Sequence, residues 1–221
     1  NRLNDHRGNG FRAVQRSDLQ HDRPLFAVHF VDAQRGVAVG LWSLVLTTAD
    51  GGAHWSPVPL ATPPGAKKAD LNLLGLFADA QGRLYATGER GMLLRSADQG
   101  ARWDYLGTGY AGSFWTGAAP APGVLLAAGL RGSLYRSADD GKTWARVDSG
   151  STSAITALLH RGAAVVALGL DGLVLRSADG GATFSATPRA DRLALTTGVL
   201  TADGEPVLFS RQGTVARTAK P

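Results

Sequence analysis

Four aspartates recur in this chain within one short pattern, and carboxylates at a fixed spacing can bind a cation, act in catalysis or shape a turn. Each Asp lies two residues after a Ser or Thr, two before a Gly and five before an aromatic residue. We call these segments boxes. They cover 48–55, 96–103, 137–144 and 177–184, with carboxylates Asp50, Asp98, Asp139 and Asp179 and aromatic residues Trp55, Trp103, Trp144 and Phe184.

The repetition itself favours a structural role for these carboxylates. A catalytic site needs different residues that converge at one place, whereas a turn can be repeated in every unit of a fold. In a tight turn the Asp accepts hydrogen bonds from backbone amides, and the Gly takes a positive φ. The aromatic residue then anchors the next strand in the core. We therefore interpret the boxes as turns and predict no metal site and no cofactor.

The boxes follow one another at intervals of about 40 to 48 residues, which is the period of a propeller blade. Near-continuous apolar runs such as 173–175 indicate strands that are buried on both faces, as stacked blades require. The sequence thus predicts an all-β protein, a β-propeller in one domain over 1–221. The predicted blades cover 25–60, 71–106, 113–148, 154–187 and 193–218.

The fifth predicted blade reaches its third strand at 214–218 and has no box. At the other end of the chain, Phe11-Arg12-Ala13-Val14 aligns with Trp144-Ala145-Arg146-Val147, the strand that follows a box, and Gly8 aligns with Gly141. We expect 11–16 to complete the fifth blade, which would close a five-bladed ring and remove two unpaired edges. A larger ring of six or seven blades is the alternative if the chain is incomplete.

Composition excludes several kinds of protein. The chain of 221 residues has 44% hydrophobic residues, 29 Gly and no Cys, so it has no disulfides and no thiolate metal site. It has no apolar run long enough for a membrane span. No hydrophobic leader is seen, so the protein is either intracellular or already processed. The formal charge of +5 favours acidic partners, although bacterial chains rich in Arg are often basic without one.

A candidate binding face comes from the turns between second and third strands, at the opposite end of each blade from the boxes. These turns offer Trp42, Arg90, Arg131 and Arg211, and Lys67 and Lys68 follow in the longest loop between blades. Guanidinium groups suit carboxylates, and Trp is a frequent anchor at interfaces. Asp171 is an acidic exception, and a set of ordinary solvated turn residues is an equally good interpretation. A second series, Arg95, Arg136, Arg176 and Arg217, precedes the boxes, where we expect a structural role.

The boxes resemble the Asp-box, or bacterial neuraminidase repeat, of sialidases and sortilin-type receptors. Residues 27–36 and 129–137 are similar to the blade sequences of bacterial relatives of the photosystem II stability and assembly factor family. This resemblance implies a non-enzymatic scaffold or assembly factor that binds a membrane protein or membrane complex with an acidic surface, and no nucleic acid. It also implies an extracytoplasmic, periplasmic location, with the cytoplasm as the alternative. The family's rings usually have seven blades, and this chain departs from that number.

Two other functions use the same fold. A sialidase-like glycosidase needs three converging arginines, for which Arg90, Arg131 and Arg211 are candidates, and a Tyr/Glu pair. The chain has only two Glu, Glu89 and Glu205, and only Tyr110 of its four tyrosines lies in a loop between blades. A carbohydrate-binding propeller without catalysis would stack sugars on Trp42, Tyr110 and Trp115. Since fold alone does not transfer function, we predict that the protein is not an enzyme.

Overall fold

The computed structural model describes residues 23–215, and these form nineteen strands in five antiparallel sheets. The first sheet holds β1 (Leu25–Phe30), β2 (Gly36–Gly40), β3 (Val45–Thr48) and β4 (Ser56–Pro57); the second holds β5 (Leu73–Ala78), β6 (Leu84–Gly88), β7 (Met92–Ser96) and β8 (Asp104–Gly107). The third holds β9 (Phe114–Ala121), β10 (Val124–Gly129), β11 (Leu134–Ser137) and β12 (Ala145–Arg146); the fourth holds β13 (Ile155–Arg161), β14 (Ala164–Gly169), β15 (Val174–Ser177) and β16 (Ser185–Ala186). The fifth sheet has three strands, β17 (Leu195–Leu200), β18 (Pro206–Ser210) and β19 (Gly213–Val215).

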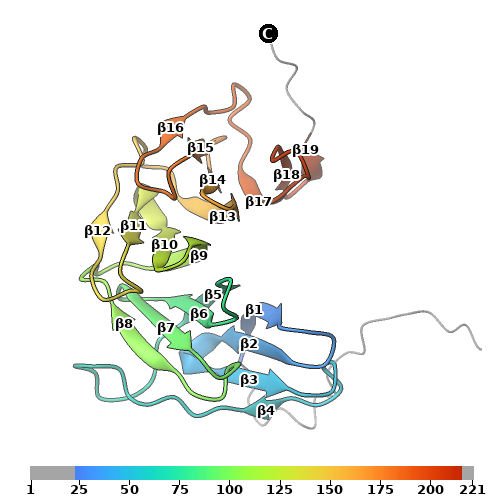
Figure 1. The fold of residues 1–221 in the computed structure, drawn as a ribbon, viewed down its shortest axis with the longest axis vertical. Coiled ribbons are helices and arrows are strands. Elements are labelled where there is room, and N and C mark those ends of the chain that lie inside the picture. Colours follow the sequence, from blue (N-terminus) through green and yellow to red (C-terminus); the bar gives the residue numbers. More distant parts are fainter. Residues whose placement is uncertain (1–22, 216–221) are drawn as a thin grey trace, which may run out of the picture.

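Each sheet is one blade, and the blades follow one another around an arc (Figure 1). The first strand of every blade lies on the inner side of the arc, and β4, β8, β12 and β16 lie on its outer side. Neighbouring inner strands contact each other from β1 through β5, β9 and β13 to β17. The prediction of an all-β, five-bladed propeller is confirmed.

The blades stack because their central strands are apolar on both faces. All five residues of β2, and all five of β6, are buried. Four separate apolar clusters lie at the four joints between successive blades, and each contains residues from both blades. In the second joint, for example, Tyr85 and Leu93 of one blade pack against Phe114 and Leu125 of the next. Each large side chain buried in this way contributes about 1.5–3 kcal/mol.

The box aromatic residue belongs to the joint with the preceding blade. Trp103 packs in the cluster that contains Val58, which lies three residues after the first box aromatic, Trp55. The same arrangement recurs in the next two joints. Leu106, three residues after Trp103, packs with the cluster that holds Trp144. Val147, three residues after Trp144, packs with the cluster that holds Phe184. The repeat therefore encodes contacts between blades as well as the strands within a blade.

The boxes are turns held by their own side chains. In the third box, Ser137 Oγ donates to Asp139 Oδ1 at 2.7 Å, and Gly141 N donates to Ser137 Oγ at 2.9 Å. The Asp139 carboxylate also accepts from Thr143 N at 2.9 Å and from Thr143 Oγ1 at 2.6 Å. The other three boxes repeat this pattern, with His54, Arg102 or Thr183 at the position of Thr143.

These hydrogen bonds favour the charged form of each box carboxylate. Donation from Thr143 lowers the pKa of Asp139 to about 2. The pKa values of the other three box carboxylates are also lowered, mainly by the residue four positions later: Asp50, Asp98 and Asp179. Among residues 23–215 no three His, Asp or Glu side chains gather in a way that could hold a metal ion.

Arginines join neighbouring blades at the end of the sheets where the boxes lie, which we call the box face. In each of the first three joints, one guanidinium reaches an atom of the following box. The contacts are Arg35 Nη1 to Gln99 Oε1 (2.5 Å), Arg83 Nη2 to Asp140 Oδ1 (2.7 Å) and Arg136 Nε to Gly180 O (3.0 Å). Arg35 and Arg83 were not singled out in the sequence, and the charges of these three arginines are thus used within the fold.

The two end blades each have one face against which no blade packs among the described residues. In β1, Phe26, Val28 and Phe30 are exposed, and Val28 reaches 60%. In β17, Val199 is 55% exposed. The strand predicted at 11–16 to complete the fifth blade lies outside the described residues.

The box carboxylates make stability depend on acid pH. Because the pKa of Asp139 is depressed from 3.8 to about 2, its stabilisation is complete above pH 4 and is lost as the pH falls through about 2. We expect the thermal midpoint, followed by circular dichroism, to fall steeply between about pH 4 and pH 2. Asp139→Asn should lower the midpoint at pH 7 and flatten this decline. Asp104→Asn, at an exposed carboxylate outside the boxes, should follow the parent. Parallel curves for Asp139→Asn and the parent would contradict this role.

Arg83 should stabilise the joint between the second and third blades. Its Nε lies 2.6 Å from Asp79 Oδ2, and the Asp79 side chain is only 4% exposed. Arg83→Ala leaves this buried carboxylate without its cation and removes the bond to Asp140. We expect a loss of about 2–3 kcal/mol in the free energy of unfolding, measured by urea denaturation. Arg146→Ala, at an exposed position in β12, is the control and should cost little. Equal losses in the two variants would refute the assignment.

Candidate functional site

The turns between second and third strands present their side chains from one backbone conformation. In blades one to four the second turn residue has φ of 53° to 55°, and the third turn residue has φ of 57° to 70°. The second residues are Trp42, Arg90, Arg131 and Asp171. Two consecutive positive φ values match the tight hairpin turn that suits the twist of paired strands. All four side chains therefore leave the sheets in equivalent directions, on the surface that we call the hairpin face.

Trp and Arg are unusual at such a turn position. The left-handed region favours Gly, Asn and Asp, and other residues there carry a conformational cost of about 1–2 kcal/mol. Asp171 is the one residue of the set that this backbone prefers. The third position is Ser43 in the first blade and Gly in the next three, and in the second blade a Cβ on Gly91 would lie 1.8 Å from the carbonyl oxygen of Tyr110. Among residues 23–215 the side chains of Trp42 and Arg131 form no hydrogen bond or ion pair, so the described part of the fold gives no reason for this cost at those two positions.

Arg90 is part of a small charged group at the second blade. Its Nη1 lies 3.4 Å from Asp70 Oδ1, and Lys68 Nζ lies 3.8 Å from Asp70 Oδ2. The side chains of Arg90 and Lys68 remain 58% and 78% exposed. Lys68 therefore lies beside the second hairpin, as expected from the sequence, and Lys67 is the exposed residue before it. One carboxylate is shared by two cations, so positive charge is left at the surface.

The remaining predicted arginines lie at the third and fifth hairpins. Arg131 and Arg211 are both exposed, and neither forms an ion pair within residues 23–215. Asp171, at the fourth hairpin, accepts from Ser153 Oγ at 2.8 Å and so braces the adjoining loop. Positive groups thus occur at three of the five hairpins, with Trp42 at a fourth.

A pocket of about 440 Å³ opens on the hairpin face beside the fourth blade, and it contains arginines that the sequence did not single out. Its lining includes Asp171, Arg189 and Arg192. Arg189 pairs with Asp191 at 2.5 Å, whereas Arg192 is an exposed residue with φ of 51°. The sequence could have indicated Arg189 and Arg192, because the loops between blades end on the hairpin face.

The aromatic residues considered for sugar stacking do not form a platform. Tyr110 lies in an apolar cluster, with its ring 5.1 Å from those of Phe114 and Tyr135, and its hydroxyl accepts from Ser133 Oγ at 2.8 Å. Trp115 is half-buried within β9. Of the three residues, Trp42 is the one that lies at a hairpin with an exposed ring, and it is 57% exposed.

The residues needed by a glycosidase are used elsewhere. Glu89 accepts from the backbone N and the Nδ2 of Asn72 at 3.1 and 3.0 Å, and Asn72 Oδ1 accepts from Trp42 N at 3.1 Å. Glu205 lies on the box face, 3.4 Å from Arg176. Tyr85 is buried, and burial followed by the charge of Asp79 raises its pKa to about 12. No Tyr/Glu pair therefore faces Arg90, Arg131 and Arg211.

Comparisons with known proteins place the sequence near one family. The family model described as photosynthesis system II assembly factor YCF48 matches residues 11–109, so the resemblance predicted from the sequence is confirmed there. The photosystem II assembly lipoprotein Ycf48 of Synechococcus sp. (strain CC9902) is 30% identical over 89 residues, which are 40% of this chain and 26% of that protein. The chain thus spans about a quarter of the length of this curated relative.

Solved structures show the same fold at lower identity. A structure of YCF48 bound to D1 peptide superposes with a TM-score of 0.67 and 20% identity, covering 87% of this chain and 62% of that one. Virginiamycin B lyase from Staphylococcus aureus superposes with a TM-score of 0.71 and 12% identity, covering 91% of this chain and 72% of the lyase. Assembly factors and enzymes share this architecture, so the fold by itself does not choose between them. No helix within residues 23–215 is long and apolar enough to cross a membrane.

Glu89 should act in structure and not in catalysis. Replacing it by Gln keeps its shape but weakens its hold on Asn72, which connects the first two hairpins. We expect Glu89→Gln to lower the thermal midpoint by a few degrees, with no hydrolysis of a fluorogenic sialoside by either protein. Hydrolysis by the parent that disappears in a variant with unchanged melting would identify Glu89 as catalytic instead.

Proposed function

We propose that the protein is a non-enzymatic assembly or stability factor that binds a membrane protein or membrane complex through the hairpin face. The binding residues are Trp42, Lys67, Lys68, Arg90, Arg131 and Arg211. The confirmed family resemblance supports the assembly role, and the relative described as a lipoprotein supports an extracytoplasmic location. The similar YCF48 structure is a complex with D1 peptide, which supports a polypeptide as the ligand class here.

The observation that carries the proposal is the set of exposed Trp and Arg residues at strained, equivalent turn positions. A residue kept in an unfavourable conformation without a structural need is a reasonable candidate for function. Arginine recognises carboxylates through paired, charge-assisted hydrogen bonds, and Trp contributes a large apolar contact. Because the hairpins belong to successive blades, their charges add over one surface and steer an acidic partner toward it.

A charge reversal at two hairpins tests this surface. Arg90→Glu combined with Arg131→Glu should slow association with the partner by about tenfold at low salt and weaken its salt dependence. Co-purification from detergent-solubilised membranes of the source organism, repeated at low and high salt, supplies the readout. Thermal melting should change little, because both side chains are exposed and Lys68 still faces Asp70 when Arg90 is replaced.

The matched control reverses two arginines of the box face. Arg95→Glu combined with Arg136→Glu makes the same change in net charge but removes the bond from Arg136 to the carbonyl of Gly180. This variant should melt at a lower temperature and retain binding while folded. If the Arg90/Arg131 variant binds as well as the parent at low salt, the hairpin face is not the binding surface.

A further inference from the structure

The hairpin turns carry exposed apolar side chains as well as positive charge. Outside the end strands β1 and β17, the large apolar side chains that are exposed among residues 23–215 are Trp42, Leu130 and Leu170. All three lie in turns between a second and a third strand, and Leu130 directly precedes Arg131. The exposed apolar side chains of the blades are thus gathered on the hairpin face.

The two leucines do not contribute to the core. Neither Leu130 nor Leu170 belongs to an apolar cluster formed by the described residues. Single exposed apolar residues are common on protein surfaces, so their exposure alone indicates little. Their place is more informative, because residues scattered without a role would occur at both ends of the sheets and not only at the tips of one face.

The third and fourth hairpins are held in fixed positions by the loop between their blades. At one end of this loop Ser149 Oγ donates to the carbonyl of Gly132 at 2.9 Å. At the other end Ser153 Oγ donates to Asp171 Oδ2 at 2.8 Å. The apolar tips are therefore ordered before any ligand binds, which lowers the entropic cost of binding at this surface.

Unpaired cations surround these tips. Arg131, Arg192 and Arg211 are exposed and form no ion pair within residues 23–215. Lys68 adds a further exposed cation beside the second hairpin. Lysine and arginine are attracted to anionic lipid headgroups, and Trp and Leu insert at the boundary between headgroups and acyl chains. The hairpin face combines both kinds of group.

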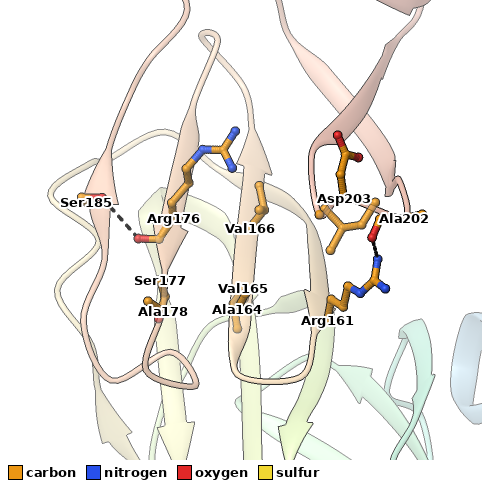
Figure 2. Close-up of a pocket in the computed structure, with 12 residues that line it drawn as sticks. Arg161, Ala164, Val165, Val166, Arg176, Ser177, Ala178, Ser185, Ala202 and Asp203 are labelled. Carbon is orange, nitrogen blue, oxygen red and sulfur yellow. Dashed lines mark hydrogen bonds between the residues drawn. The ribbon is translucent and has the colours of Figure 1, made fainter.

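The box face differs in both respects. At the joint between the fourth and fifth blades, Arg161 and Arg176 line a pocket of about 600 Å³ (Figure 2). Arg161 donates to the carbonyl of Ala202, as Figure 2 shows. Arg176 Nη2 lies 3.4 Å from Glu205 Oε2. These arginines make contacts within the fold, and among residues 23–215 no turn of the box face exposes a large apolar side chain.

We propose that the hairpin face docks directly on an anionic lipid surface. Trp42, Leu130 and Leu170 insert among the headgroups, and the surrounding cations face the lipid phosphates. Lipids can close around separate tips, whereas the apolar core of a protein interface is continuous. The inference goes beyond the proposed function because it requires no partner protein. A membrane protein bound by the Arg and Trp residues would lie in the same lipid surface.

The experiment measures binding of the full chain to sedimented, protein-free vesicles at low salt. Vesicles of phosphatidylcholine mixed with phosphatidylglycerol should bind the parent, and pure phosphatidylcholine vesicles should bind it at least tenfold more weakly. Leu130→Ser combined with Leu170→Ser should lower the partition coefficient for the anionic vesicles about tenfold without a change in thermal midpoint, because both side chains are exposed. Phospholipids brominated on the acyl chain should quench the tryptophan fluorescence of the parent more than that of Trp42→Phe.

A matched pair of charge reversals separates the two faces. Arg131→Glu combined with Arg192→Glu should reduce binding to anionic vesicles at least tenfold. Lys142→Glu combined with Arg146→Glu makes the same change in net charge at exposed positions of the third box and β12, and should reduce it much less. Equal losses in these two variants would overturn the proposal. So would absence of binding by the parent, or equal binding to the two kinds of vesicle.

The leucine variant also distinguishes this inference from the proposed function. Co-purification of the partner from detergent extracts involves no bilayer, so Leu130→Ser/Leu170→Ser should co-purify the partner as the parent does. If this variant loses the partner while its binding to anionic vesicles is unchanged, the leucines contact a protein and the proposed lipid docking is wrong. Loss of vesicle binding with the partner retained would support lipid docking by the hairpin tips.

Discussion

A blade whose central strands are apolar on both faces needs a neighbour on each face, and the rest of this structure depends on that constraint. One blade alone would expose a layer such as Leu126 and Leu134 on one side and Leu125 and Ala127 on the other. Stacking buries these layers in joints that contain residues of two blades. The stability of each blade is therefore shared with its neighbours, as in other repeat proteins. Where a neighbour is missing among the described residues, as beside β1, large apolar side chains such as Val28 are exposed.

The box turns solve a second problem, which is how to fix the position of one blade relative to the next. The Asp carboxylate and the Ser or Thr hydroxyl satisfy the turn amides locally, so each turn has a defined shape. A defined turn can then serve as a contact for its neighbour, as the carbonyl of Gly180 does for Arg136. The same residues thus act within a blade and between blades. This double use explains why a carboxylate that repeats at regular intervals need not be a metal ligand or a catalyst.

The two ends of the blades differ in whether their charged side chains are held by contacts with a neighbouring blade. At the box face, arginines such as Arg83 are held by partners in the neighbouring turn, and substitution there should be felt in stability. At the hairpin face, Arg131 and Trp42 extend from the turns with most of their surface exposed. Exposed side chains at the hairpin face can be exchanged without loss of the fold. Their identity can therefore be set by a binding partner. Arginines of the box face are therefore used in contacts between blades, whereas Arg131 of the hairpin face forms no ion pair within residues 23–215.

The sequence by itself determined the repeat, the strand order within each blade and the turn chemistry of the boxes, because these depend on residues that are close in the chain. The period of the boxes is enough to predict blades, and the Ser-x-Asp-x-Gly spacing is enough to predict turns such as 137–141. The equivalence of Trp42, Arg90 and Arg131 also followed from their place in the repeat. The contacts between blades were not accessible in this way. Arg35 reaches Gln99 across 64 positions, and Arg83 reaches Asp140 across 57, and neither spacing carries a local signal. The packing of the half-buried Tyr110 and the pocket beside Arg176 were likewise decided only by how the blades stack. The pairing of Arg90 with Asp70 depends on how the loop before the second blade folds against its hairpin. Side chains that meet across a joint do so because two sheets are packed together, and that geometry belongs to the tertiary structure.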